Sequence, residues 1–267
     1  MMAEDSVLLD VDERGVAALT INRPEIHNAF DDALINRLLQ ALESVEMDPR
    51  VRVVILRAEG KSFSAGADLN WMRRMADYSE EENLADARIL AKLMQTLNGL
   101  SKPTIARVQG AAFGGGVGLV ACCDMAVASE RARFSLSEVR LGLIPAVISP
   151  YVIAAMGERS GRRYFLTAER FDADEAYRLG LLHGVVPEEQ LDSRIEELVA
   201  ELLKGGPKAL AAAKSLIFAV SRQPTGEAVI EDTARRITAT RASDEGKEGL
   251  NAFLNKRPPD WIEEGTE

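Results

Sequence analysis

The chain has 267 residues, of which 46% are hydrophobic and 28% charged, as in an ordinary globular protein. Its 32 Lys and Arg residues against 42 Asp and Glu residues give a formal charge of −10. A protein this acidic repels a polyanion such as DNA, and an aromatic content of 5% leaves few rings for stacking on bases. A general nucleic-acid binder is therefore not expected.

Cysteine and histidine are scarce in this chain. The two cysteines, Cys122 and Cys123, are adjacent, and the histidines are His27 and His183. A disulfide framework and a metal centre are therefore not expected. The start of the chain, Met-Met-Ala-Glu-Asp, lacks the basic and apolar regions of a signal peptide, and residues 108–123 are too few for a membrane span. We expect a cytoplasmic protein without membrane contact.

The first half of the chain alternates between strand and helix patterns. Apolar, β-prone residues predict a strand at 16–21, and apolar residues at helical spacing predict a helix from Asp31 to about Val45. The segments that follow are a strand at 51–56, a loop at 58–70, a helix at 80–100, a strand at 104–108, a helical or mixed segment at 117–128, and a strand-like alternation at 134–139. This order predicts an α/β fold with a largely parallel core.

The pattern becomes helical after about Pro187. Helices are predicted at 190–203, 208–220 and 226–254, separated by breaks that contain glycine and proline. We therefore divide the chain into a core at 1–190 that holds the ligand site and a helical region at 191–267. Such a tail packs either on the core or on a neighbouring subunit.

Two segments of small residues follow predicted strands, SFSAGADL at 62–69 and GAAFGGGVG at 110–118. Small residues let a ligand approach the backbone, and the second segment opens a helix whose N–H groups and dipole favour a negative charge. One N–H group from each segment could form an oxyanion hole. The structural alternatives are a tight loop for the first segment and close helix–strand packing for the second.

Other chemistry fits less well. Gly116, Gly118 and Ala121 match a dinucleotide fingerprint formally, but the match begins inside a glycine run in mid-chain. No G-x-S-x-G elbow accompanies the glycine run, which argues against a serine hydrolase. The two histidines are expected to be structural. Glu138 is either a solvated acid at a strand end or an acid–base group.

The segments SFSAGADL, GAAFGGGVGLVACCDMAVAS, FSLSEVRLGLIP and LTAERFDADEAYRLGLLHGVV, in this order, resemble the crotonase superfamily, the enoyl-CoA hydratase/isomerase family. The resemblance covers residues 7–261. It implies a spiral of ββα units, followed by a helical region at 191–267 that builds a homotrimer or a dimer of trimers. Within the family, ADLNWM, SEVRLGLIPAVISPYV and AERFDADEA are most similar to the bacterial methylglutaconyl-CoA and isohexenylglutaconyl-CoA hydratases of leucine and acyclic-terpene breakdown.

The resemblance also implies roles for individual residues. The N–H groups of Ala67 and Gly115 would bind the thioester oxygen while it carries the enolate charge, and Glu138 would transfer the proton. Substrate and coenzyme A contacts are implied for Ala65, Gly66, Asp68, Leu69, Asn70, Trp71, Arg23 and Lys256, with Met72, Lys61, Arg73, Arg74 and Arg257 as further candidates. Coenzyme A is part of the substrate, so no separate cofactor and no metal are expected.

The chain departs from the family pattern at two places. The first of the two hydratase glutamates falls on Gly118, which leaves Glu138 as the single family carboxylate. Residues 146–149 (AVIS) replace a glycine-rich run and are expected to reshape the acyl pocket. We expect hydration of a branched enoyl-CoA resembling 3-methylglutaconyl-CoA. The alternatives are a Δ3,Δ2-enoyl-CoA isomerase that uses one glutamate and a non-catalytic protein that binds acyl-CoA or RNA.

Overall fold

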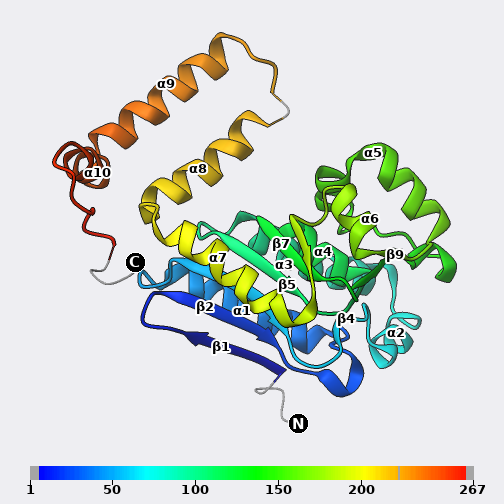
Figure 1. Cartoon of the computed structure of the whole chain (residues 1–267). Helices are drawn as coiled ribbons and strands as arrows, with labels where there is room; N and C mark the ends of the chain where they lie inside the picture. Colours follow the sequence, from blue (N-terminus) through cyan, green and yellow to red (C-terminus); the bar gives the residue numbers. More distant parts are fainter. Residues whose placement is uncertain (1–5, 222, 263–267) are drawn as a thin grey trace. The chain divides into compact units, whose positions relative to one another are not determined.

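A computed structural model describes residues 6–221 and 223–262 (Figure 1). The chain forms two compact units. Unit 1 contains the residues up to Leu100 together with Thr104–Glu196, and unit 2 contains Ser101–Pro103 and the residues from Glu197 onward. The division after Glu196 falls inside helix α7 (Leu191–Leu203), a few residues beyond the boundary expected at 190.

Unit 1 is built on two sheets within the described residues. The larger sheet contains, in spatial order, β1 (Val7–Val11), β2 (Val16–Ile21), β3 (Val53–Ala58), β5 (Thr104–Val108), β7 (Met125–Ser129) and β10 (Gly184–Val186). The smaller sheet contains, in spatial order, β4 (Ser62–Ser64), β6 (Ala111–Phe113), β8 (Arg133–Ser135) and β9 (Phe171–Asp172). All paired strands are parallel except β1 with β2 and β8 with β9, which confirms the α/β class with a largely parallel core.

A three-part unit repeats along unit 1: a strand of the larger sheet, then a strand of the smaller sheet, then helix. The repeats are β3–β4 with α2 (Leu69–Met75) and α3 (Glu80–Gly99), β5–β6 with α4 (Gly115–Cys122), and β7–β8 with α5 (Ser149–Thr167). Because β3, β5 and β7 are neighbours in one sheet and β4, β6 and β8 in the other, each repeat lies beside the previous one. The chain therefore advances as a spiral of ββα turns (Figure 1).

Local sequence signals explain the long helices next to the sheets. Helix α1 (Asp32–Met47) begins where the Asp31 side chain accepts a hydrogen bond from the Leu34 N–H at 2.8 Å. Its buried residues follow the predicted stripe: Leu34, Ile35, Leu38, Leu42 and Val45. Helix α3 begins with a capping box between Ser79 and Glu82. The predictions of both helices are thus confirmed.

Three local predictions are wrong. The loop expected at 58–70 contains β4 and the start of α2, because β4 pairs with β6, a contact distant in sequence. The alternation at 134–139 is strand only to Ser135, and Glu138 begins a 3-10 turn, η3 (Glu138–Leu141), which ends on Gly142 at φ +73°. The helix expected at 226–254 is two helices, because the Ser243 side chain caps a new helix.

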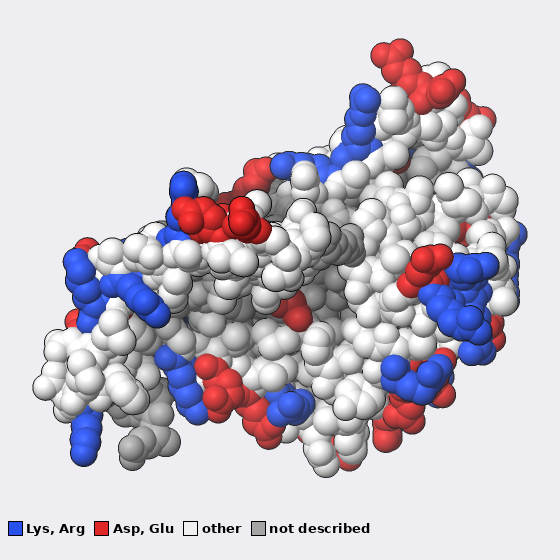
Figure 2. Space-filling model, turned by 90° about the horizontal axis from the view of Figure 1, so that it is seen from above, with Lys and Arg blue, Asp and Glu red and all other residues white. Residues whose placement is uncertain are grey.

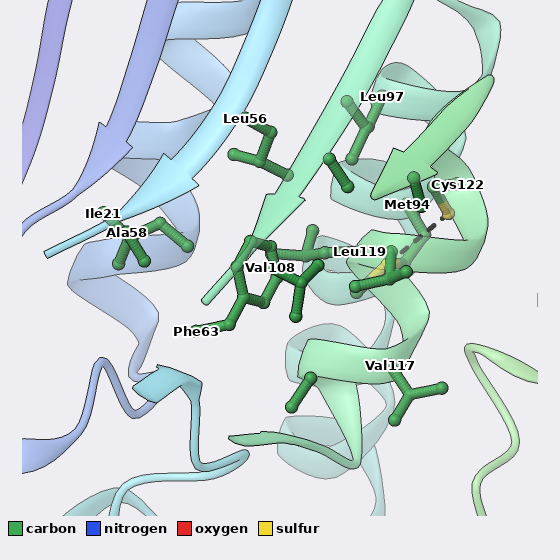
Figure 3. Close-up of a cluster of buried hydrophobic side chains, with 14 of the residues drawn as sticks. Ile21, Leu56, Ala58, Phe63, Met94, Leu97, Val108, Val117, Leu119 and Cys122 are labelled. Atoms are coloured by element: carbon green, nitrogen blue, oxygen red, sulfur yellow. Dashed lines mark hydrogen bonds between the residues drawn. The ribbon is translucent and has the colours of Figure 1, made fainter. Parts of the chain in front are cut away.

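Buried side chains from both sheets and from the helices packed on them form the core of unit 1, and Figure 3 shows part of it. The close-up shows Ile21, Leu56 and Val108 from the larger sheet, Phe63 from β4, Met94 and Leu97 from α3, and Val117, Leu119 and Cys122 from α4. The Cys122 thiol donates a weak hydrogen bond to the Met94 sulfur at 3.8 Å. This packing fixes α3 and α4, which both contribute to the cavity described below.

The remaining helices are short in unit 1 and long in unit 2. They are α6 (Ala173–Arg178), α8 (Pro207–Val220), α9 (Glu227–Ala242) and α10 (Asp244–Leu254), with 3-10 turns η2 (Pro24–Ile26) and η4 (Glu188–Gln190). Among the described residues, no helix combines the length and apolar character that a membrane crossing requires.

Candidate active site

A cavity of about 680 Å³ opens in unit 1. Its wall comes from the segment 65–75, the face of α3 from Asn83 to Leu90, the start of α4, and the segment 137–148. A volume of this size suits a small-molecule ligand. The wall is mostly apolar, so the few polar groups in it decide what the cavity can do.

The first polar group is the backbone N–H of Ala67. A parallel bridge joins Ala67 to Phe30: the Phe30 N–H donates to the Gly66 carbonyl at 2.7 Å, and the Asp68 N–H donates to the Phe30 carbonyl at 2.7 Å. Because peptide groups alternate in direction along an extended strand, this pairing turns the Ala67 N–H away from Phe30. Within the described chain, no protein acceptor takes that N–H.

The second polar group is the backbone N–H of Gly115, at the first position of α4. Helix geometry leaves this N–H without an intrahelical acceptor, and no other acceptor is found among the described residues. Gly114 precedes it at φ +50°, a backbone that favours glycine. A Cβ atom on Gly115 would lie 3.1 Å from the Phe30 ring. Phe30 therefore contacts both segments that carry the free N–H groups.

Glu138 brings a carboxylate to the same place. Its Oε1 lies 3.1 Å from the position that a Cβ atom on Gly114 would take, next to the start of α4. Its Oε2 is buried and, among the described residues, has no hydrogen-bond partner. Burial raises the pKa of Glu138 above its ordinary value, because the charged form loses solvation. A half-buried acid with an unsatisfied oxygen can exchange protons with a bound ligand.

A buried asparagine that the sequence analysis missed holds the first segment in place. Asn28 is fully buried at φ +55°, and its side-chain amide donates to the carbonyls of Glu59 and Ser62, both at 2.8 Å. Its own carbonyl accepts from the Ser64 hydroxyl at 2.9 Å. Asparagine tolerates positive φ better than most residues. Asn28 in NRPEIHNAF could therefore have been recognised from the sequence as a candidate for a turn with positive φ. The neighbouring His27 faces the Ser62 hydroxyl at 3.1 Å and does not line the cavity.

A second carboxylate of the cavity was also missed by the sequence analysis. Asp86 of α3 lines the wall, and its Oδ1 accepts a hydrogen bond from the Trp71 indole N–H at 3.2 Å. Burial raises the pKa of Asp86 from its ordinary value. The helical spacing of Asn83, Asp86, Ala87 and Leu90 would have shown that they share one face, but not that this face meets a cavity.

The residues predicted to contact substrate fall into two groups. Ala65, Gly66, Leu69, Trp71 and Met72 line the cavity together with Ala67, Gly115 and Glu138. Asp68 and Asn70 belong to the same segment but not to the lining. Asp68 instead caps α2, accepting from the N–H groups of Asn70 and Trp71 at 2.8 and 3.0 Å.

The basic residues expected near coenzyme A do not line the cavity. Arg23 pairs with Asp31 at 2.8 Å, while Lys256 lies exposed in unit 2. Of the further candidates, Lys61 is exposed, Arg73 donates to Asn70, Arg74 pairs with Asp32, and Arg257 pairs with Glu248. Figure 2 shows acidic and basic side chains interspersed over one face of the molecule. No lysine or arginine is found in the cavity wall formed by the described residues.

A cavity that offers two free N–H groups beside a helix N-terminus, together with a carboxylate, has the groups that stabilisation of a developing oxyanion requires. Residues 12–264 match the model of the enoyl-CoA hydratase/isomerase family. The chain belongs to this family.

Relatives of known structure share the fold over nearly the whole chain. An enoyl-CoA hydratase from Shewanella pealeana is 46% identical with a TM-score of 0.94, covering 98% of this chain and 100% of that one. An enoyl-CoA hydratase/isomerase (crotonase) from Legionella pneumophila is 48% identical with a TM-score of 0.91, covering 97% and 99%. The 2,3-dehydroadipyl-CoA hydratase of Escherichia coli is 33% identical, covering 93% and 96%. The spiral of ββα turns is thus the crotonase fold.

The raised pKa of Glu138 predicts a pH-dependent cost in stability. Between the carboxyl pKa of the unfolded chain and the higher pKa of the folded protein, the folded state binds more protons, so stability falls as pH rises. Glu138→Gln does not titrate. We expect the variant to match the wild type at low pH and to exceed it above the raised pKa. Urea unfolding of both proteins across this range measures the difference, and a gap that is constant or widens toward low pH would contradict the prediction.

Proposed function

We propose that this protein hydrates the double bond of a branched α,β-unsaturated acyl-CoA thioester. The observation that carries the proposal is that Glu138 lines the same apolar cavity as Ala67 and Gly115, whose N–H groups are free, and lies beside Gly114 at the start of α4. Those N–H groups are suited to bind the thioester oxygen where negative charge develops. Each well-placed donor of this kind contributes about 3 kcal/mol.

In the proposed reaction, Glu138 both takes and returns a proton. Its carboxylate accepts a proton from water while the water oxygen forms a bond to Cβ, and the electron pair of the double bond moves toward the thioester. The resulting enolate oxygen accepts hydrogen bonds from Ala67 and Gly115. Glu138 then gives a proton to Cα, which restores the carboxylate and leaves one water added. A raised pKa favours the return step because it makes the acid form easier to reach.

The acyl group is proposed to be branched, and two branched candidates differ in charge. The sequence resemblance points to 3-methylglutaconyl-CoA, which bears a second carboxylate. The described lining contains two carboxylates, Asp86 and Glu138, and no basic side chain, so its charges favour an uncharged acyl group such as 3-methylcrotonyl. The two thioesters therefore differ in the charge that they would bring into the cavity.

A double-bond isomerase is the second candidate function. The observation that favours it is the absence of a side chain at Gly118, where the family's first hydratase glutamate falls, which leaves Glu138 as the single family carboxylate. In that reaction Glu138 would remove a proton from Cα of a β,γ-unsaturated thioester and return it to the γ-carbon. The enolate charge would again fall on the oxygen held by Ala67 and Gly115.

We also propose that unit 2 assembles the protein into a homotrimer or a dimer of trimers. Its helices expose several large apolar side chains in the single chain: Ile217, Phe218, Ile230, Ile237, Leu250, Phe253 and Leu254. Exposed apolar residues in this number are typical of surfaces that a partner covers. A symmetric contact with copies of the same chain would bury them.

Glu138→Gln is predicted to lower kcat for hydration by about 10²- to 10⁴-fold, because the amide can neither accept nor return the proton. The fold, followed by circular dichroism, and the binding of a saturated acyl-CoA should be retained. Glu130→Gln, which replaces an exposed glutamate outside the cavity, is the matched control and should keep wild-type turnover. Near-normal turnover by Glu138→Gln would overturn the assigned role.

The absorbance of the conjugated thioester separates the candidate reactions. With crotonyl-CoA, 3-methylcrotonyl-CoA, 3-methylglutaconyl-CoA and a β,γ-enoyl-CoA as the panel, a hydratase removes absorbance from one or more of the first three. An isomerase instead generates absorbance from the fourth. We expect the largest kcat/KM for a branched α,β-unsaturated thioester. Tight binding without turnover of any member would favour the non-catalytic alternative.

The assembly proposal predicts that wild-type protein sediments as three or six chains. Phe253→Asp is expected to shift the protein toward single chains, because Phe253 is 80% exposed in the isolated chain and its replacement would place a charge in the interface. Asn251→Asp changes an exposed polar neighbour on the same helix and should leave the assembly intact. Wild-type protein that sediments as a single chain would rule out the proposed assembly.

A further inference from the structure

Ile148 covers the face of α4 on which Gly118 lies. A Cβ atom on Gly118 would lie 2.2 Å from Ile148 Cγ2 and 2.9 Å from Ile148 Cβ, with the Met94 methyl group at 3.3 Å. These distances are too short for any side chain at position 118 unless Ile148 moves. Ile148 is 3% exposed, so the contact belongs to the packed interior. The space beside Gly118 is therefore filled with hydrocarbon.

The cavity wall reflects the same contact. Ile148 lines the cavity, whereas Gly118 does not. At this point of the wall, the residue that lines the cavity is thus Ile148 and not the glycine of α4 that it covers. An isoleucine at this place gives the ligand an apolar, shape-specific surface.

This surface lies close to the proposed reacting carbons. Gly118 follows Gly115 by three residues, so the two positions share one face of α4 and are about 4.5 Å apart along its axis. The N–H of Gly115 is proposed to hold the thioester oxygen, and Cα and Cβ are the next two carbons of the acyl chain. The side chain packed on Gly118 is therefore within reach of a substituent on Cβ.

We propose that Ile148 determines acyl-chain selectivity by contacting a methyl branch on Cβ of the substrate. A β-branched acyl chain would bury its methyl group against Ile148, whereas a linear chain has no such group to bury. The same packing keeps position 118 free of the family's first glutamate, so the apolar wall and the presence of only one family carboxylate, Glu138, have one cause. This inference rests on the proposed function for its placement of the thioester.

Binding of saturated thioesters tests the inference without any turnover. The dissociation constants of 3-methylbutanoyl-CoA and butanoyl-CoA are measured by titration calorimetry with the full-length protein. We expect the wild type to bind the branched ligand about fourfold more tightly, the effect of burying one methyl group. Ile148→Ala should bring the ratio close to one, and Ile148→Val should give an intermediate ratio. An unchanged ratio in both variants would overturn the inference.

A second isoleucine that packs on a glycine, away from the cavity, provides a matched control for Ile148→Ala. Ile153 of α5 lies 2.1 Å from the position of a Cβ atom on Gly161, and neither residue lines the cavity. Ile153→Ala should therefore keep the wild-type ratio of dissociation constants. If Ile148→Ala fails to fold in circular dichroism, the ratio for Ile148→Val decides. A further outcome is that the wild-type protein hydrates no thioester and still binds 3-methylbutanoyl-CoA more tightly than butanoyl-CoA. That result would refute the proposed function and leave the inference about Ile148 standing.

A double-mutant cycle tests the contact itself. Gly118→Ala is expected to lower the unfolding midpoint in the wild-type background, because its Cβ atom would overlap Ile148. In the Ile148→Ala background the same change should cost much less, so the double variant should lose less stability than the two single variants lose in sum. Additive effects of the two substitutions would show that the contact does not exist in solution, and the inference would fail with it.

Discussion

Phe30 links the two donors of the proposed oxyanion site. Its backbone forms the parallel bridge that turns the Ala67 N–H away from the bridge, and its ring lies against Gly115. An oxyanion site works only if both N–H groups are fixed before the charge develops, because reorientation during the reaction would cost the energy that they supply. Asn28 extends this support, since its buried amide holds the carbonyl of Glu59, which precedes β4, and that of Ser62, the first residue of β4. The geometry of the site thus depends on a short segment far from it in sequence.

The buried carboxylate follows from the same architecture. Gly114 lets the chain turn into α4 at positive φ and leaves room for Glu138 Oε1 beside it. Burial of Glu138 costs stability, yet it is also the cause of the raised pKa that suits a group proposed to take and return one proton. The loss of stability on burying this acid and its proposed chemical use therefore both come from its burial, as is common at active sites.

The apolar character of the cavity complements this chemistry. Most of the wall, Ile148 included, is apolar, and apolar surroundings strengthen the few polar interactions that remain. The formal charge of −10 belongs to the whole chain and says little about the cavity, where two carboxylates and no described basic side chain decide the local charge. In the proposed function, recognition of the acyl group would therefore rest on shape, and we attribute part of it to the contact of Ile148 with Gly118.

Much of the fold was predictable from local signals. The stripe of α1, the helical pattern of α3 and the apolar, β-prone run of β2 depend on residues close together in sequence, and each of these elements was recognised. The short strand β4 was not recognised, because it is determined by its pairing with β6, which is distant in sequence. At 134–139 the strand was expected to continue past Ser135, where the 3-10 turn at Glu138 follows instead.

The sequence by itself determined the α/β class, the family, and the identity of Ala67, Gly115 and Glu138 as candidates for the chemistry. It also showed that Gly118 lacks the family's first glutamate, and that 146–149 is bulkier than usual. Only the tertiary structure joined these two departures, by placing Ile148 on Gly118. It likewise brought Asp86 and Trp71 into the same wall and paired Arg23 with Asp31 away from it. Such contacts cannot be read from spacing, because packing between segments far apart in the chain decides which side chains meet.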